Sequence, residues 1–150
     1  MALFTDGSLS TMLDLQTNES AILTVASTAG IDLAGKMALA QADLTNHILK
    51  FLLRRSQYPE AQWTQRRIRG VSDVVVTAPL KQWHVHKTLA FVYRDVYNSQ
   101  ANDRFLGKWK EYEQLARQSC DNYFQVGVGI VADPLSKPSS LLVSTVTGSG

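Results

Sequence analysis

The sequence predicts a mainly α-helical protein: a small bundle of about four helices with a short β segment and extended arms at both ends. Apolar residues recur at steps of three and four, and residues typical of helix caps bound these stretches. With 150 residues, 45% of them hydrophobic and 19% charged, the chain can bury one core and is not of the disordered class. We expect an N-terminal arm over 1–16, part of which can form a short helix, a helical domain over 17–128 and a C-terminal arm over 129–150.

The first two helices are expected over about 17–29 and 32–55. Thr17 or Asn18 can cap the first helix, and Gly30 suits the left-handed residue that ends it. Asp32 can cap the second helix. Apolar residues at helical spacing mark one face of the second helix as buried, and these are Leu33, Met37, Ala40, Leu44, Ile48, Phe51 and Leu52.

Two further helices are expected over about 77–98 and 103–126. Thr77 can cap the third helix, since Pro79 is tolerated in a first turn. The break between the two is short, so they should form an antiparallel hairpin. Before them, the β-prone run of Val74, Val75 and Val76 is either a short strand or a buried connector.

The C-terminal arm differs in composition from the rest of the chain. Residues 130–150 contain only Asp133 and Lys137 as charged residues, and they include a β-prone run. Such an arm is expected to pair as a strand with another chain through main-chain hydrogen bonds, or to fold back on its own domain. The candidate docking residues are Leu141, Leu142, Val143, Ser144, Thr145, Val146 and Thr147.

Charge is distributed unevenly along the chain. Residues 1–43 contain one basic residue against five acidic ones, whereas residues 44–94 contain nine basic residues against two acidic ones. This asymmetry is typical of contact with a polyanion, or of identical subunits that pack head to tail. The cluster Arg66, Arg67 and Arg69 is the candidate for channel contacts to DNA or for contacts between subunits.

No pattern in the sequence predicts catalysis or a cofactor. Cys120 is a single cysteine on an apolar helix face, where a buried and inert thiol is expected. His84 and His86 lie two apart on a helix, so they point in different directions and do not share a metal ion. We therefore expect neither an enzyme nor a cofactor. No apolar run is long enough for a membrane span, and the first residues lack signal-peptide features.

Several blocks together carry a family resemblance. Residues 83–95 (WHVHKTLAFVYRD) lead into 102–105 (NDRF), then 108–113 (KWKEYE), then 127–135 (GVGIVADPL). This layout, over residues 20–135, resembles the head–tail adaptor (connector) proteins of tailed bacteriophages and related particles. The long N-terminal arm and the Ser/Thr-rich tail depart from the commonest form of that family.

The resemblance implies a structural virion protein of the neck, between capsid and tail, assembled in the host cytoplasm. It implies a ring of about twelve copies that joins the portal protein to tail or neck proteins. Double-stranded DNA would pass through the ring without sequence-specific contacts. Two alternatives stay open: a DNA-binding packaging protein of the small-terminase kind, and another neck or tail-completion ring protein.

Overall fold

The computed structural model describes residues 2–56 and 70–131, and the mainly helical fold predicted from the sequence is confirmed there. The α-helices of this part are α1 (Met12–Asn18), α2 (Ile22–Ala29), α3 (Leu33–Ser56), α4 (Ala78–Gln100) and α5 (Asp103–Val126). Two short 3-10 turns accompany them, η1 (Phe4–Asp6) and η3 (Val71–Asp73).

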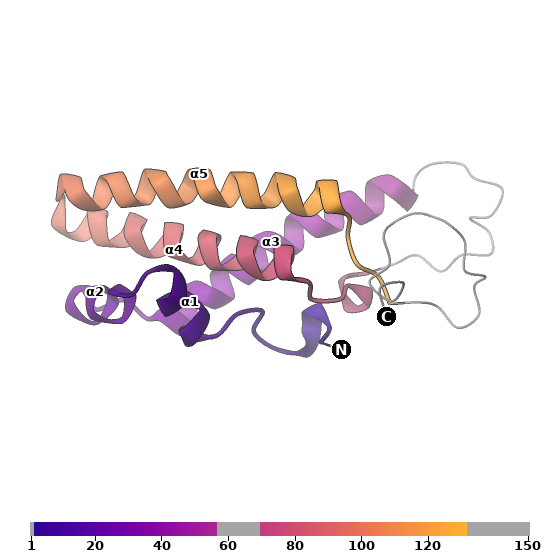
Figure 1. The fold of residues 1–150 in the computed structure, drawn as a ribbon, viewed down its shortest axis with the longest axis horizontal. Coiled ribbons are helices and arrows are strands. Elements are labelled where there is room, and N and C mark those ends of the chain that lie inside the picture. The colour runs from indigo at the N-terminus through magenta and orange to yellow at the C-terminus, as the bar shows by residue number, and fades with distance from the viewer. Residues whose placement is uncertain (1, 57–69, 132–150) are drawn as a thin grey trace.

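α4 is the central helix of the bundle. It forms an antiparallel hairpin with α5 along their full length, as predicted, and it also packs against α3, α2 and α1 (Figure 1). Its start follows the expected signals, because the Thr77 side chain accepts a hydrogen bond from the Leu80 N–H and Pro79 lies in the first turn. Eleven of its residues are buried, two of them histidines.

The predicted start of the first helix, near residue 17, is wrong. α1 ends at Asn18 and α2 begins at Ile22, so Thr17 and Asn18 close one helix and do not cap another. The cap lies upstream, where Thr11 and Asp14 form a reciprocal capping box. The expected end is confirmed, since Gly30 is left-handed with φ 70°.

The N-terminal segment is not the extended arm that the sequence predicts. Phe4, Leu9 and Leu15 are 3%, 5% and 0% exposed, so each fills a place in the core. The Gln41 side chain on α3 holds the segment by donating to the carbonyls of Phe4 and Gly7 and by accepting from the Leu9 N–H. Burial of these three apolar side chains and the Gln41 hydrogen bonds offset entropy that the ordered segment loses.

The predicted strand over Val74–Val76 is also wrong, and the alternative, a buried connector, is correct. The residues just before Val74 form the 3-10 turn η3. In this turn the Asp73 carboxylate accepts a hydrogen bond from the Gly70 N–H. Only isolated bridges follow in the described part of the chain, Leu3 with Val75 and Val74 with Ile130. The connector thus lies between the N-terminal segment at Leu3 and the C-terminal segment at Ile130. Each of these segments pairs through one residue only, which is too few for a β-sheet ladder.

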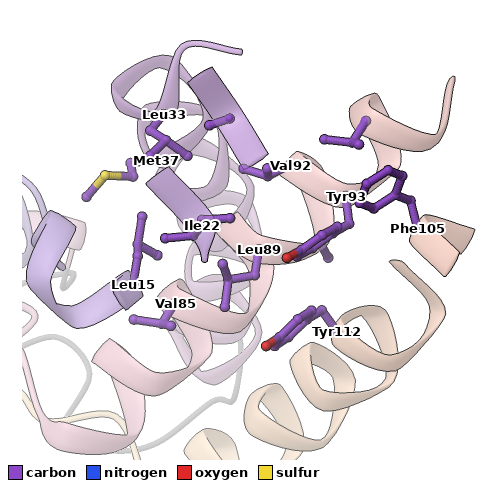
Figure 2. Packing of buried hydrophobic residues seen from close by; sticks show 13 residues of the cluster. Leu15, Ile22, Leu33, Met37, Val85, Leu89, Val92, Tyr93, Phe105 and Tyr112 are labelled. Atoms are coloured by element: carbon purple, nitrogen blue, oxygen red, sulfur yellow. The ribbon is translucent and has the colours of Figure 1, made fainter. Parts of the chain in front are cut away.

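The core has two parts, one toward each end of the bundle. Figure 2 shows the part near the α4–α5 turn, where Leu15 and Ile22 meet Leu89 and the stacked rings of Tyr93 and Tyr112. The other part lies where α4 begins and α5 ends. It contains Phe4, Leu9, Leu44, Ile48, Leu52, Val74, Leu80, Trp83, Tyr123, Val128 and Ile130.

The C-terminal arm is described only as far as Val131. Val128 and Ile130 are buried, and the Val131 N–H donates to the Asp73 carbonyl at 2.8 Å. The first three residues of the predicted arm therefore belong to the body. Residues 132–150 lie outside the described part.

The α4–α5 turn contains one strained residue. Ala101 is left-handed, with φ 52° and ψ 36°, and the next residue, Asn102, caps α5 by accepting from the Arg104 N–H. A left-handed conformation places the Cβ of a non-glycine residue against the backbone. Ala101 is thus a site where removal of a methyl group relieves strain.

We expect Ala101→Gly to raise the free energy of unfolding by about 0.5–1 kcal/mol, measured by urea denaturation. The control is Ala38→Gly at an exposed site inside α3, where glycine costs about 1 kcal/mol. An equal loss of stability in both variants would contradict the strain at Ala101.

Candidate functional site

The contact residues predicted from the sequence lie outside the described part of the chain. These are Arg66, Arg67, Arg69 and the seven residues from Leu141 to Thr147. The described chain stops at Ser56, resumes at Gly70 and stops again at Val131. All three points lie at the end of the bundle where α5 ends and α4 begins (Figure 1). Both predicted segments are therefore attached at one end of a helical body.

Glu19 is the polar centre of the other end. Its carboxylate lies between α1 and α2 and accepts hydrogen bonds from the hydroxyls of Tyr93 on α4 and Tyr112 on α5, the latter at 3.1 Å. Lys108 adds an ion pair at 3.4 Å. The Glu19 side chain is 15% exposed. One carboxylate thus joins the α1–α2 turn to both helices of the hairpin.

The electrostatics of this cluster favour an ionised Glu19. Burial raises the pKa of Glu19, but the hydrogen bonds from Tyr93 and Tyr112 and the charge of Lys108 outweigh burial and lower it. Burial, together with the nearby Glu19 carboxylate, raises the pKa of both tyrosines. The tyrosines are therefore hydrogen-bond donors and do not act as bases.

A second polar contact is buried between the N-terminal segment, α3 and α4. His84 is 0% exposed, with Nδ1 at 2.8 Å from Ser10 Oγ and Nε2 at 2.9 Å from the Met37 carbonyl. A carbonyl only accepts, so Nε2 carries the proton, and neutral His84 accepts from the Ser10 hydroxyl. Burial lowers the pKa of His84, and the Met37 carbonyl opposes this only in part. His84 is therefore neutral near pH 7.

His86 points to the opposite side of α4, as the spacing predicts. Its Nδ1 lies 2.7 Å from Ser119 Oγ on α5, and burial lowers the pKa of His86. Cys120, beside Ser119, is half-buried, and burial raises the pKa of its thiol to about 11. At neutral pH this thiol is protonated and a poor nucleophile.

An open groove lies between the N-terminal segment and α3, with a volume of about 640 Å³. Its lining is uncharged, and consists of Gly7, Ser8, Ser10, Thr11, Met12, Ala34, Met37, Ala38, Gln41 and Ala42. Ser10 is 1% exposed and its hydroxyl is bonded to His84, so this hydroxyl is not available to a ligand in the groove. Over 2–56 and 70–131, no three His, Cys, Asp or Glu side chains are grouped to hold a metal ion.

Much of the charge asymmetry in the sequence is neutralised within the chain. Three acidic residues of the first 43 form ion pairs with basic residues of α4 and α5. The pairs are Asp14–Lys81 at 3.5 Å, Asp43–Lys87 at 3.6 Å and Glu19–Lys108 at 3.4 Å. The acidic third therefore packs largely on its own hairpin. In the described part, Lys50 and Arg54 near the end of α3 are exposed and form no ion pair, which leaves positive charge where α3 leads to Arg66.

Comparison with known proteins does not assign the chain to a family. No protein-family model, curated protein or solved structure matches the chain. No single helix of the described residues is long and apolar enough to cross a membrane, and only α2 with most of α3, a pair bent by 105°, passes that test by length and composition.

Sequence reasoning did not find the contacts at Glu19 or at Ser10. Each joins residues more than 70 positions apart, as with Tyr93 and Glu19 or His84 and Ser10. Local spacing contains no signal for such pairs. The one available signal, the Thr11–Asp14 capping box, marks the helix that brings Glu19 and Ser10 to the hairpin.

We expect Glu19→Gln to lower the free energy of unfolding by about 1–2 kcal/mol at pH 7, because a neutral amide is a weaker acceptor for three donors. The folded pKa of Glu19 is below its ordinary value of 4.5, so its contribution is complete above pH 4.5 and is lost as the pH falls through the folded pKa. Urea denaturation at pH 7 and pH 3 should show a difference that shrinks in acid.

The control is Glu111→Gln, at an exposed position on α5. It should change stability little at either pH. A Glu19→Gln deficit that is the same at both values of pH would contradict an ionised Glu19 as the source of the stabilisation.

Proposed function

We propose that this chain is a structural virion protein, a head–tail adaptor whose copies form a ring between the portal and the tail. One observation supports the proposal most. The described body is a helical bundle in which the buried side chains of His84, His86 and Tyr93 are hydrogen-bonded within the bundle, and the basic cluster and the charge-poor tail both attach at the same end of it. In this proposal the arrangement serves to hold partners.

In this proposal each segment has one role. Residues 132–150 dock on the portal or on a neighbouring copy, with Leu141 to Thr147 as the pairing strand. Arg66, Arg67 and Arg69 face the DNA channel or an adjacent subunit, and the exposed Lys50 and Arg54 extend the same positive region. The ring would have about twelve copies and would sit in the neck of the virion.

The docking role is tested by ending the chain after Val131. This boundary keeps Ile130, which is 7% exposed, and the Val131 hydrogen bond to Asp73, so the body should fold. We expect unchanged helical circular dichroism and unfolding, but no joining to portal-bearing heads in an assembly assay.

A matched control keeps the length of the tail and replaces only Leu141, Val143, Thr145 and Thr147 by Ser or Gly. These alternate residues share one face of a strand. We expect this variant to fail in joining as the truncation does. Normal joining by both variants would contradict the docking role, and the symmetry of a ring seen by electron microscopy would separate an adaptor from a tail-completion protein.

The alternative is a DNA-binding packaging protein, and the unpaired positive charge near the end of α3, within the described residues, favours it. For an adaptor we expect weak binding to duplex DNA that falls steeply with salt and does not depend on sequence. Replacing Arg66, Arg67 and Arg69 by Gln should weaken it further in a mobility-shift titration. The control, Gln at Arg104, Lys110 and Arg117 of α5, should have a smaller effect. Tight, sequence-preferring binding would favour the packaging protein and contradict the adaptor.

A further inference from the structure

α3 has a second, largely uncharged face on the side away from the core. Its residues recur at steps of four and three, and we call them the outer stripe: Gly35, Leu39, Ala42, Asn46, Leu49 and Leu53. At 100° per residue they lie within about 40° of one line along the helix, opposite the buried stripe of Met37, Leu44 and Ile48. Leu39 and Leu53 are 46% and 53% exposed.

A period of 3.5 residues is the spacing of a coiled-coil seam. α3 continues unbroken through all six positions. The two small residues of the outer stripe, Gly35 and Ala42, would let a second helix come close. Charged residues are absent from the stripe itself. The charged residues lie on its flank, where Lys36 and Asp43 form ion pairs with Asp95 and Lys87 of α4 and Lys50 is exposed.

Asn46 indicates which partner fits this seam. A side-chain amide in the middle of an apolar seam needs a partner that both donates and accepts. A second copy of α3, parallel and in register, supplies one, because Asn46 then faces Asn46. Asparagine at such a position is known to specify register and pairing in coiled coils.

Charge selects the same orientation. In a parallel pair, Asp43 and Lys50 on one flank of the seam face the uncharged Ala38 and Thr45 of the second copy. In the antiparallel pair that would align the two stripes, Lys36 would instead face Lys50, Asp43 would face Asp43, and Asn46 would face an alanine of the stripe. The antiparallel pair therefore combines like charges with an unsatisfied amide.

We propose that the outer stripe is a self-association surface, on which α3 of a second copy packs parallel and in register. Such a pair is isologous and closes on itself, whereas a ring needs heterologous contacts. The pair is thus the form of the free chain before ring assembly. The α3 pair rests on the self-association that the proposed function includes, but it does not require a ring. The α3 pair and the ring can therefore be disproved separately.

The test uses Leu39→Cys in the full-length chain, with Cys120→Ala to remove the native thiol. In a parallel pair, the introduced thiol would face its counterpart, so mild oxidation should yield a disulfide-linked dimer on a non-reducing gel. The control is Leu13→Cys on α1, which is more exposed at 69% but lies off the stripe and should not cross-link. Equal cross-linking at both sites, or none at Leu39, would overturn the proposal.

A second measurement does not depend on a thiol. Sedimentation of the wild-type chain at micromolar concentration should show a dimer, and Leu39→Glu should raise its dissociation constant at least tenfold, while Leu13→Glu should not. Both sites are exposed in the single chain, so folding should be unaffected in either variant. A monomeric wild-type chain would overturn the proposal.

The same experiments distinguish two other partners that could cover the outer stripe, the C-terminal tail and a membrane. If the dimer is lost when the chain ends after Val131, the tail covers the stripe and the α3 pair is wrong. If wild-type chain binds vesicles of anionic phospholipid and Leu39→Glu abolishes that binding, the stripe faces a membrane and the α3 pair is again wrong. Rings seen without any α3 cross-link would overturn this proposal and leave the adaptor function standing.

Discussion

The packing of this protein depends on the buried polar side chains of α4. A histidine or tyrosine inside a core is stabilised when its polar atoms have partners, and an unpaired one, such as the buried Tyr123 hydroxyl on α5, costs about 1–3 kcal/mol. His84 finds Ser10 and the Met37 carbonyl, His86 finds Ser119, and Tyr93 finds Glu19. Each of these bonds sets the position of a different neighbour. The N-terminal segment, α3, α5 and the α1–α2 turn are thereby placed around one helix.

This arrangement uses the reactive groups of the described chain as structural contacts. A neutral His84 beside a serine has the composition of a catalytic pair, but its other nitrogen and the serine hydroxyl are both engaged inside the core. Cys120 is kept protonated by burial. What is left for interaction is a set of surfaces: an uncharged groove, the outer stripe of α3, and a positive end. These surfaces are the basis of the proposal that the protein works by assembling.

Sequence reasoning predicted helices well where the signal was local. Thr77 with Pro79, and Gly30, are caps that act within one turn, so the start of α4 and the end of α2 could be predicted from a few residues. It was less successful where tertiary burial decided the outcome. Phe4 and Leu9 were expected in an arm, yet they fill the core beside Trp83, because no local pattern reports what lies opposite them in space. Val74–Val76 had β propensity but lacked neighbours long enough to form a ladder.

The sequence by itself determined the helical class, the α4–α5 hairpin and the divergence of His84 and His86, since helical periodicity, caps and residue spacing are short-range properties. Tertiary structure alone decided that the acidic residues Asp14, Glu19 and Asp43 meet basic residues of the same chain. The buried face of α3 follows from its apolar spacing, and Met37, Leu44 and Ile48 are indeed buried. No local pattern reports which basic residues lie opposite the acidic ones, because such contacts are a property of the packed chain and not of one helix.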